Sequence, residues 1–250
     1  MKSMKSMLAA GVLLASLCAC KQAKEVTIMS YNVHNCIGLD KVRDYERIAR
    51  VINEAAPDVV AVQELDSATE RNGGVYALAE LEKLTGMNGI FASAISFQGG
   101  SYGIGLLSKE QPLKYKIVPM PGREEERALI VAEFRDYVFC ATHQSLTPDD
   151  QLASVALIEK ELAGIDKPVF LAGDMNSTPS SQPQQLLART FVSLNDTAAF
   201  TFPADLPDRC IDYIYADRQR MERVEVKERR VLNEPQASDH RPVLVKLLLE

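Results

Sequence analysis

Six short segments place polar side chains within or directly after apolar, strand-like runs of the chain. They cover residues 31–34, 63–64, 142–143, 173–176, 210–213 and 238–240. Each segment alone has an ordinary explanation, because Asp and Asn often form turns and short motifs match by chance. Considered together they are informative, because carboxylates, amides and histidines recur in them.

Four carboxylates in these segments are expected to converge on one edge of the fold. They are Glu64, Asp174, Asp212 and Asp239. Like charges held close together raise each other's pKa unless a cation neutralises them. With the amides of Asn32 and Asn176 beside them, the ligand set is rich in hard oxygen atoms and suits Mg²⁺ or Mn²⁺ rather than zinc. The pattern therefore predicts a divalent metal site.

The chain has only three histidines, and all of them lie in these segments. His143 and His240 could move protons or stabilise an anionic oxygen near neutral pH. His34 shares one face of the first predicted strand with Asn32, because side chains alternate along a strand, and we expect it in a supporting or structural role. A divalent cation, a carboxylate base and histidines together indicate metal-assisted hydrolysis of a phosphate ester.

These side chains can meet only if several strands end at a common edge. Alternation, β-branched residues and turn signals predict strands over 25–34, 58–65, 90–97, 104–109, 113–120, 128–134, 137–142, 169–172, 211–215, 224–231 and 243–248. Periodicity and capping residues predict helices over 44–55 and 75–84, and a third that begins at residue 147. Two halves that each begin with strands and carry helices predict two stacked sheets with helices on both outer faces.

The composition is that of a globular protein with a negative net charge. Of 250 residues, 46% are hydrophobic and 25% are charged, which excludes a disordered or coiled-coil chain. No linker or internal repeat interrupts residues 26–250, which we interpret as a single domain and expect to be a monomer. The formal charge of −6 argues against tight, sequence-independent binding of long nucleic acid, so no extended nucleic-acid surface is expected.

The first residues resemble a bacterial lipoprotein signal. Lys2 and Lys5 precede an apolar run over 7–17 that is too short to span a bilayer, and the small Ala19 precedes Cys20. An ordinary cleaved signal peptide, in which Cys20 is incidental, is the alternative.

We accordingly predict a signal peptide over 1–19, a lipidated Cys20, a tether over 20–25 and a lipid anchor in the bacterial cell envelope. Export permits disulfides. The remaining cysteines are Cys36, Cys140 and Cys210. Their number is odd, so at least one is expected to stay unpaired.

The ordered segments SYNVHN, QEL, GSYGIGLLS, ATHQSL, GDMNSTPSS, CIDYIYA and SDHRPV resemble the endonuclease/exonuclease/phosphatase superfamily, which includes DNase I. The resemblance runs from about residue 26 to the C-terminus. It implies an α+β fold, a four-layer α/β/β/α sandwich in which two mixed sheets pack face to face with helices outside. It also implies Glu64 as the principal ligand of Mg²⁺ or Mn²⁺, with Asn32 and Asp239 in or beside the metal shell.

The same resemblance implies roles for the residues around the phosphate. Asp174 would activate or position the attacking water, and Asn176 would hold the phosphate. His240 would stabilise the phosphate in the transition state, oriented by Asp212, and His143 would contact the phosphate from the other side.

Substrate contacts are harder to assign from sequence. Tyr102 lies where several family members place a substrate-contacting aromatic residue, although a packed tyrosine explains it equally well. Arg127, and also Arg71 and Arg123, could clamp a phosphate, since Arg suits bidentate phosphate contact. For all three arginines, a solvated surface position is the default expectation.

The expected activity is hydrolysis of a small or lipid-linked phosphate ester. Sphingomyelinase-like, inositol-phosphatase-like and secreted-nuclease activities all remain open, because the shared residues handle only the phosphate. DNA repair is disfavoured, because GDMNSTPSS lacks the sequence typical of abasic-site repair enzymes, because His143 stands where those enzymes usually carry Asn, and because an exported lipoprotein would meet no genomic DNA. An envelope-bound nuclease acting on DNA or RNA is the first alternative, and a non-catalytic binding domain of the same fold is the second.

Overall fold

A computed structural model describes residues 23–250 of the chain. The predicted signal over 1–19 and the predicted lipidation at Cys20 lie outside the described residues. Within the described part, the search for a helix long and apolar enough to cross a membrane finds none.

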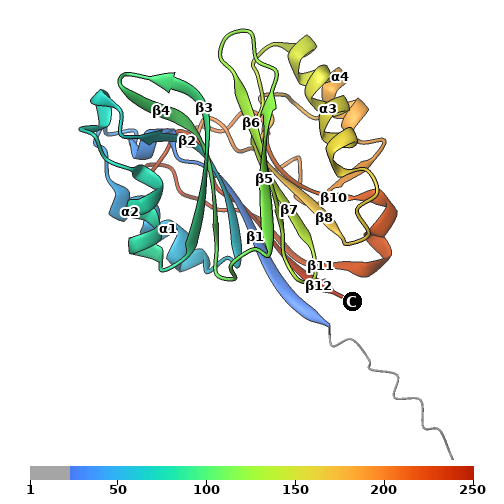
Figure 1. The fold of residues 1–250 in the computed structure, drawn as a ribbon. Coiled ribbons are helices and arrows are strands. Elements are labelled where there is room, and N and C mark those ends of the chain that lie inside the picture. Colours follow the sequence, from blue (N-terminus) through green and yellow to red (C-terminus); the bar gives the residue numbers. More distant parts are fainter. Residues whose placement is uncertain (1–22) are drawn as a thin grey trace, which may run out of the picture.

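Two six-stranded sheets form the centre of the molecule (Figure 1). The first has the order β11-β12-β1-β2-β4-β3, with bounds Val224–Val231, Val243–Leu249, Lys24–Asn32, Val59–Ser67, Gly100–Ser108 and Asn88–Phe97. The second has the order β5-β6-β7-β8-β10-β9, with bounds Lys114–Met120, Arg127–Glu133, Val138–His143, Val169–Asp174, Asp212–Asp217 and Phe191–Ser193. Both sheets are mixed, since β1 pairs in parallel with β2, and β7 with β8, whereas the other neighbours are antiparallel.

Helices cover the outer face of each sheet, which completes the predicted four-layer sandwich (Figure 1). Helices α1 (Tyr45–Ala55) and α2 (Ala77–Thr85) pack on the first sheet, and α3 (Pro148–Leu162) and α4 (Gln182–Leu187) on the second. The boundaries of α1 follow from local chemistry. The side chain of Asp44 accepts a hydrogen bond from the Arg47 amide at its start, and the left-handed Ala56 ends it before Pro57.

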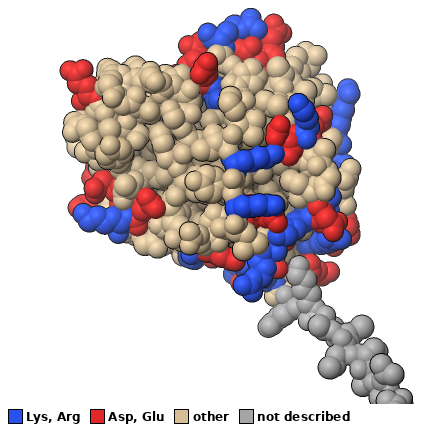
Figure 2. Space-filling view, in the orientation of Figure 1, with Lys and Arg blue, Asp and Glu red and all other residues tan. Residues whose placement is uncertain are grey.

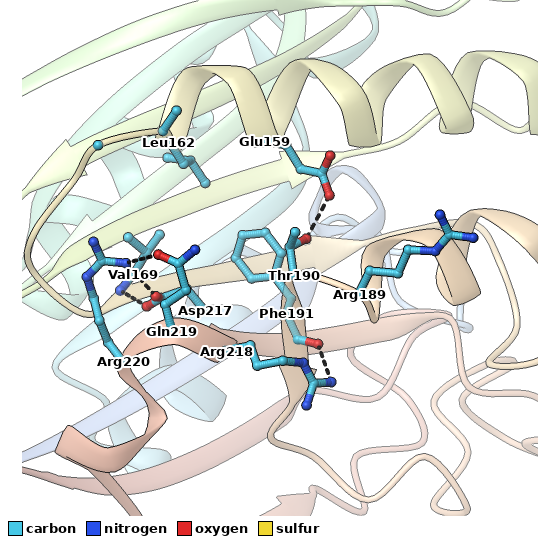
Figure 3. A pocket seen from close by; sticks show the side chains of 12 residues that line it. Glu159, Leu162, Val169, Arg189, Thr190, Phe191, Asp217, Arg218, Gln219 and Arg220 are labelled. Carbon is cyan, nitrogen blue, oxygen red and sulfur yellow. Dashed lines mark hydrogen bonds and ion pairs between the residues drawn. The ribbon is translucent and has the colours of Figure 1, made fainter.

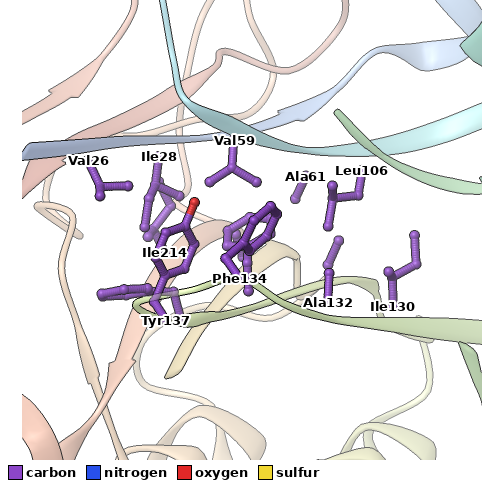
Figure 4. Packing of buried hydrophobic residues seen from close by; sticks show 14 of the residues in the cluster. Val26, Ile28, Val59, Ala61, Leu106, Ile130, Ala132, Phe134, Tyr137 and Ile214 are labelled. Carbon is purple, nitrogen blue, oxygen red and sulfur yellow. The ribbon is translucent and has the colours of Figure 1, made fainter. Parts of the chain in front are cut away.

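The core between the two sheets is built by alternation along the strands (Figure 4). In β1, Val26 and Ile28 point inward, while Met29 and Tyr31 point outward under the helices. Ile130 of β6 faces them from the second sheet. Because both faces of each sheet are covered, the central strands are apolar on both sides.

The structure corrects several predicted boundaries. The first strand ends at Asn32, because His34 has a left-handed φ of 46° within a short 3₁₀ segment, His34–Cys36, so strand alternation does not place it beside Asn32. The short elements α4 and β9 were not predicted. All three cysteines of the described chain are free and buried, which agrees with an unpaired thiol.

Candidate active site

The register of the second sheet brings three predicted site residues into one row. His143, at the end of β7, pairs with Asp174, at the end of β8. Asp174 in turn pairs with Asp212, at the start of β10. Residues directly opposite one another on neighbouring strands point to the same face. Here that face is the inner one, because Ala141, two residues before His143, belongs to the core between the sheets.

The first sheet supplies Asn32 and Glu64 from two adjacent strands. Asn32 is the last residue of β1, and alternation places it inward. Glu64 reaches the same side because β2 contains a bulge, with a register shift between Val62 and Leu65 and a φ of 60° at Glu64. A bulge of this kind redirects a side chain that strict alternation would turn outward.

A cavity of about 620 Å³ opens between the two sheets at this end of the strands. Its lining includes Glu64, Tyr102, Arg127, His143, Asp174, Asn176, Asp239 and His240. Asn32 and Asp212 are buried and contact these residues through hydrogen bonds. The structure thus gathers all the residues predicted to handle metal, water or phosphate into one place.

Asp212 and His240 form a buried pair. The Nδ1 atom of His240 lies 2.9 Å from Oδ2 of Asp212, and Nε2 lies 3.7 Å from Oδ2 of Asp174. Burial disfavours a charged imidazole, but the carboxylates of Asp212 and Asp174 outweigh it and raise the pKa of His240 to about 10. The loop that carries His240 is tied to β1, because the Ser238 hydroxyl donates to the carbonyl of Asn32 at 2.7 Å. His240 is therefore a positively charged side chain beside Asp174.

Asp174 lies at the centre of the cluster. Its Oδ1 accepts a hydrogen bond from the backbone N–H of Asn176 at 2.8 Å, and its Oδ2 accepts one from Nδ2 of Asn32 at 3.1 Å. Burial and the neighbouring charge of Asp212 raise the pKa of Asp174 to about 7. A carboxyl group with a pKa near neutrality is suited to accept a proton from water.

Asn176 adopts a left-handed conformation, with φ of 49°, which Asn tolerates better than most residues. Its side-chain Nδ2 donates to the carbonyl of Gln144 at 2.9 Å, and its own carbonyl accepts from Nε2 of Gln151 at 3.1 Å. These bonds fix the turn that follows β8 at the rim of the cavity.

Arg127 differs from its expected solvated position. It is 5% exposed, and its Nη1 lies 3.3 Å from Nδ1 of His143. Glu125 and Glu124 hold its guanidinium at 2.6 Å and 3.2 Å. Burial, and then the charge of Arg127, lower the pKa of His143 well below its usual value. Sequence reasoning missed both glutamates, although the run of acids just before Arg127 was visible.

The other two arginines are paired as well. Arg71 is exposed, as expected of a surface arginine. Its guanidinium is nevertheless engaged, because it contacts Asp66 through Nε at 2.7 Å and through Nη2 at 2.8 Å and lies over the rings of Phe97 and Tyr102. Arg123 is exposed and pairs with Asp150 at 3.0 Å, as a surface arginine would.

Tyr102 forms part of the wall between the main cavity and a smaller one of about 260 Å³. Both cavities are also lined by Glu64 and Glu125. His34 lines the smaller one, and its Nδ1 lies 3.8 Å from Oδ1 of Asp239. His34 thus lies beside the predicted metal shell, although not through strand alternation.

The donor set fits a hard divalent cation. Carboxylate oxygens of Asp174 and Asp212 and a ring nitrogen of His240 lie within 4.8 Å of one another, and within the described chain Oδ1 of Asp212 is buried without a hydrogen-bond partner. The protonated His240 contributes positive charge and not a ligand, so the ligands on offer are carboxylate oxygens. Glu64 and Asp239 add carboxylates at the edge of the same cavity. Such a concentration of negative charge calls for a cation.

The amide of Asn32 has a defined orientation within this set. Its Oδ1 accepts from the His34 amide at 3.0 Å, which turns Nδ2 toward Oε1 of Glu64 at 3.0 Å. In this arrangement Asn32 positions the Glu64 carboxylate and does not itself offer an oxygen to the cavity.

A second cavity, of about 380 Å³, lies at the opposite end of β8 and β10 (Figure 3). Its buried acid, Asp217, accepts hydrogen bonds from the Val169 amide and from Nη1 of Arg220, both at 2.8 Å. Arg218 donates to the carbonyls of Ala188 and Phe191. The buried acid there is neutralised by Arg220, so this cavity lacks the facing pair of buried carboxylates found at the other end.

Comparison with known proteins agrees with this geometry. The model of the Endonuclease/Exonuclease/phosphatase family matches residues 29–240. A Beutenbergia cavernae endonuclease/exonuclease/phosphatase is 24% identical, with a TM-score of 0.74, over 90% of this chain and 72% of that one. A Bacteroides vulgatus protein of the same description is 19% identical, with a TM-score of 0.74, over 91% and 100%. A Bacteroides thetaiotaomicron mannosyl-6-phosphatase is 17% identical, with a TM-score of 0.71, over 89% and 99%.

The family model covers most of the chain, including every segment that contributes to the cavity. The fold, the acidic cluster and its two histidines are those that metal-assisted phosphate chemistry requires. The chain therefore belongs to the endonuclease/exonuclease/phosphatase family and is a metal-dependent hydrolase of phosphate esters.

Proposed function

We propose that this protein hydrolyses a small phosphate ester with the help of Mg²⁺ or Mn²⁺. The observation that carries the proposal is the placement of Asp174 between His143 and His240, with Nε2 atoms 3.6 Å and 3.7 Å from its Oδ2. One carboxylate can accept the proton of one attacking water, and the two imidazoles that flank it can contact a single phosphate.

Each residue has a distinct part in the proposed reaction. Asp174 accepts the proton of the attacking water, since its pKa is near 7. His240, held charged by Asp212, stabilises the negative charge that develops on phosphate oxygen. A cation held by Glu64 and Asp239 would polarise the phosphate.

The charges around the cavity favour a small ester over a nucleic acid. Arg127 is neutralised by two glutamates, and Arg209 pairs with Asp208 at 2.6 Å. On the face shown in Figure 2, Lys and Arg side chains are interleaved with Asp and Glu instead of forming an unbroken basic patch. A nuclease that neutralised many phosphates would need free cationic side chains.

We further propose that Cys20 carries a lipid that anchors the protein in the cell envelope. Lys24 and Asn32 are the two ends of β1, so the chain enters the domain at the end opposite the site. This arrangement supports a substrate that is dissolved in water over one embedded in the same membrane. Release of a Cys20→Ala variant from the membrane fraction would support the anchor, and finding the wild-type protein with an unmodified N-terminus would contradict it.

The activity is tested by screening phosphate monoesters, phosphate diesters, lipid head groups and plasmid DNA with Mg²⁺ present. We expect turnover of a small ester that changes little between low and physiological salt. An Asp174→Asn variant purified in parallel controls for contaminating enzymes. Plasmid cleavage that collapses as salt rises would establish the nuclease alternative, and absence of turnover with every substrate would favour a binding domain.

A further inference from the structure

Arg127 is a buried cation that has no part in the reaction proposed above. We propose that Arg127 is a positioning residue that holds His143 as a neutral imidazole with its proton on Nε2. The inference rests on the proposed function, in which His143 contacts the phosphate.

The chemistry of the two side chains dictates this protonation. A guanidinium group only donates hydrogen bonds, and it stays protonated in proteins. Nδ1 of His143, 3.3 Å from Nη1 of Arg127, must therefore accept. A neutral imidazole that accepts at one nitrogen carries its proton on the other, and a charged imidazolium would direct a second N–H at the guanidinium.

The surroundings keep Arg127 in this position. Its Nη1 also contacts Oε1 of Glu125 at 2.6 Å, and its Nη2 contacts Oε1 of Glu124 at 3.2 Å. Glu124 is fixed in turn, since it accepts from the Ser145 hydroxyl at 2.8 Å and from the Leu146 amide at 2.7 Å. Both terminal nitrogens are engaged, and Nε, which has no partner, is buried away from the cavity surface. Arg127 therefore serves the site through His143 and not as a clamp on the substrate.

The other side of His143 faces the reaction. Its Nε2 lies 3.6 Å from Oδ2 of Asp174 and lines the cavity where the phosphate would bind. Arg127 thus turns His143 into a donor of one hydrogen bond without a charge. Across Asp174, Asp212 turns His240 into a charged donor. The two histidines supply different interactions because their partners have opposite charges.

The experiment reads the tautomer directly. Long-range ¹H–¹⁵N spectra of ¹⁵N-labelled protein at pH 7 report which ring nitrogen carries the proton, and a His143→Gln variant assigns the signals. We expect His143 of the wild type to have a bare Nδ1 and a protonated Nε2. Arg127→Met should mix the tautomers or protonate both nitrogens, whereas Arg127→Lys, which still donates one hydrogen bond, should largely restore the wild-type pattern.

An exposed arginine on β11 provides the matched control, because Arg229→Met removes the same groups far from the cavity. This variant should leave the His143 signals unchanged. A wild-type His143 protonated on Nδ1 would overturn the proposal, and this result needs no variant to fold. A well-folded Arg127→Met variant that keeps the single Nε2–H tautomer would overturn it as well.

Kinetics separate positioning from direct contact with the substrate. With p-nitrophenyl phosphate and its bis-ester as probes, Arg127→Met should lower kcat about tenfold or more, within the range of proton-transfer and hydrogen-bond contributions, and Arg127→Lys should recover most of it. A direct clamp would instead raise KM in both variants with His143 unchanged. Because the spectra do not depend on turnover, failure of the proposed function and failure of this inference are distinguishable.

Discussion

Strand β10 begins and ends with a buried aspartate, Asp212 and Asp217, and a cavity lies beside each end, yet the two ends differ in charge balance. At one end, both carboxylate oxygens of Asp217 accept hydrogen bonds. Nη1 of Arg220 lies 2.8 Å from Oδ2 of Asp217 and neutralises the charge of the carboxylate (Figure 3). At the other end, Asp174 faces Asp212, and within residues 23–250 the basic side chains beside these acids are His143, whose pKa is lowered, and His240, whose single positive charge both carboxylates share.

The difference teaches how to distinguish a site from a structural acid in this fold. A paired carboxylate such as Asp217 stabilises the packing around it, and its charge is already balanced by Arg220, so it does not require a bound cation. Two carboxylates that share one imidazolium retain a net negative charge, which favours binding of a metal or a proton. The end with the candidate active site therefore differs in its incomplete neutralisation, since burial and acidic character occur at both ends.

Removal of the metal is expected to have the largest effect on activity. Exhaustive EDTA treatment is expected to reduce hydrolysis to background, and added Mg²⁺ or Mn²⁺ should restore it, because the carboxylates at the candidate active site need a counter-charge. Calorimetric titration of Mg²⁺ into the EDTA-treated protein measures binding alongside activity. Full activity without metal would contradict the prediction, and Glu64→Gln should weaken binding and activity together.

Substitution of the central acid should have the next largest effect. Asp174→Asn keeps the size of the side chain but removes the proton acceptor, so kcat should fall about 10²–10⁴-fold. Steady-state kinetics at saturating Mg²⁺ measure the loss. Activity within threefold of the wild type would show that another group accepts the proton.

The pH dependence of stability should also differ between the two ends. The pKa of His240 is about 10 in the folded protein, above the unfolded value of about 6.5. Its contribution to the free energy of unfolding is therefore complete below about pH 6.5 and is lost as pH rises through about 10. Urea titrations in EDTA across this range should show the decline, and His240→Gln should flatten it. An unchanged slope in His240→Gln would mean that another group titrates.

The smallest effect is expected at the end of β10 that carries Asp217, where the acid has a structural role. Asp217→Asn keeps the shape but weakens the pairing with Arg220, so the free energy of unfolding should fall by about 1–3 kcal/mol. Activity per folded molecule should stay near the wild-type value. Chemical denaturation together with kinetics measures both quantities, and a large loss of kcat without loss of stability would refute the division between the two ends.

Much of this arrangement could be predicted from sequence because it depends on local rules. Alternation along β1, β7, β8 and β10 places Asn32, His143, Asp174 and Asp212 on the inner faces of their strands. The four-layer order follows from apolar strands separated by amphipathic helices. The alternation rule fails at His34, where a left-handed φ ends the first strand.

Other features arose only in the tertiary structure. The bulge that turns Glu64 inward depends on the register of β2 against β4, which no short segment encodes. The burial of Arg127 depends on two glutamates and on a histidine from the neighbouring strand. The sequence determined which residues are available and which of them share one face of an element, because side chains return to the same face every two residues in a strand and about every four in a helix. Protonation states and ion pairs were decided by the fold, because burial and the distances between charges are set by residues far apart in the chain.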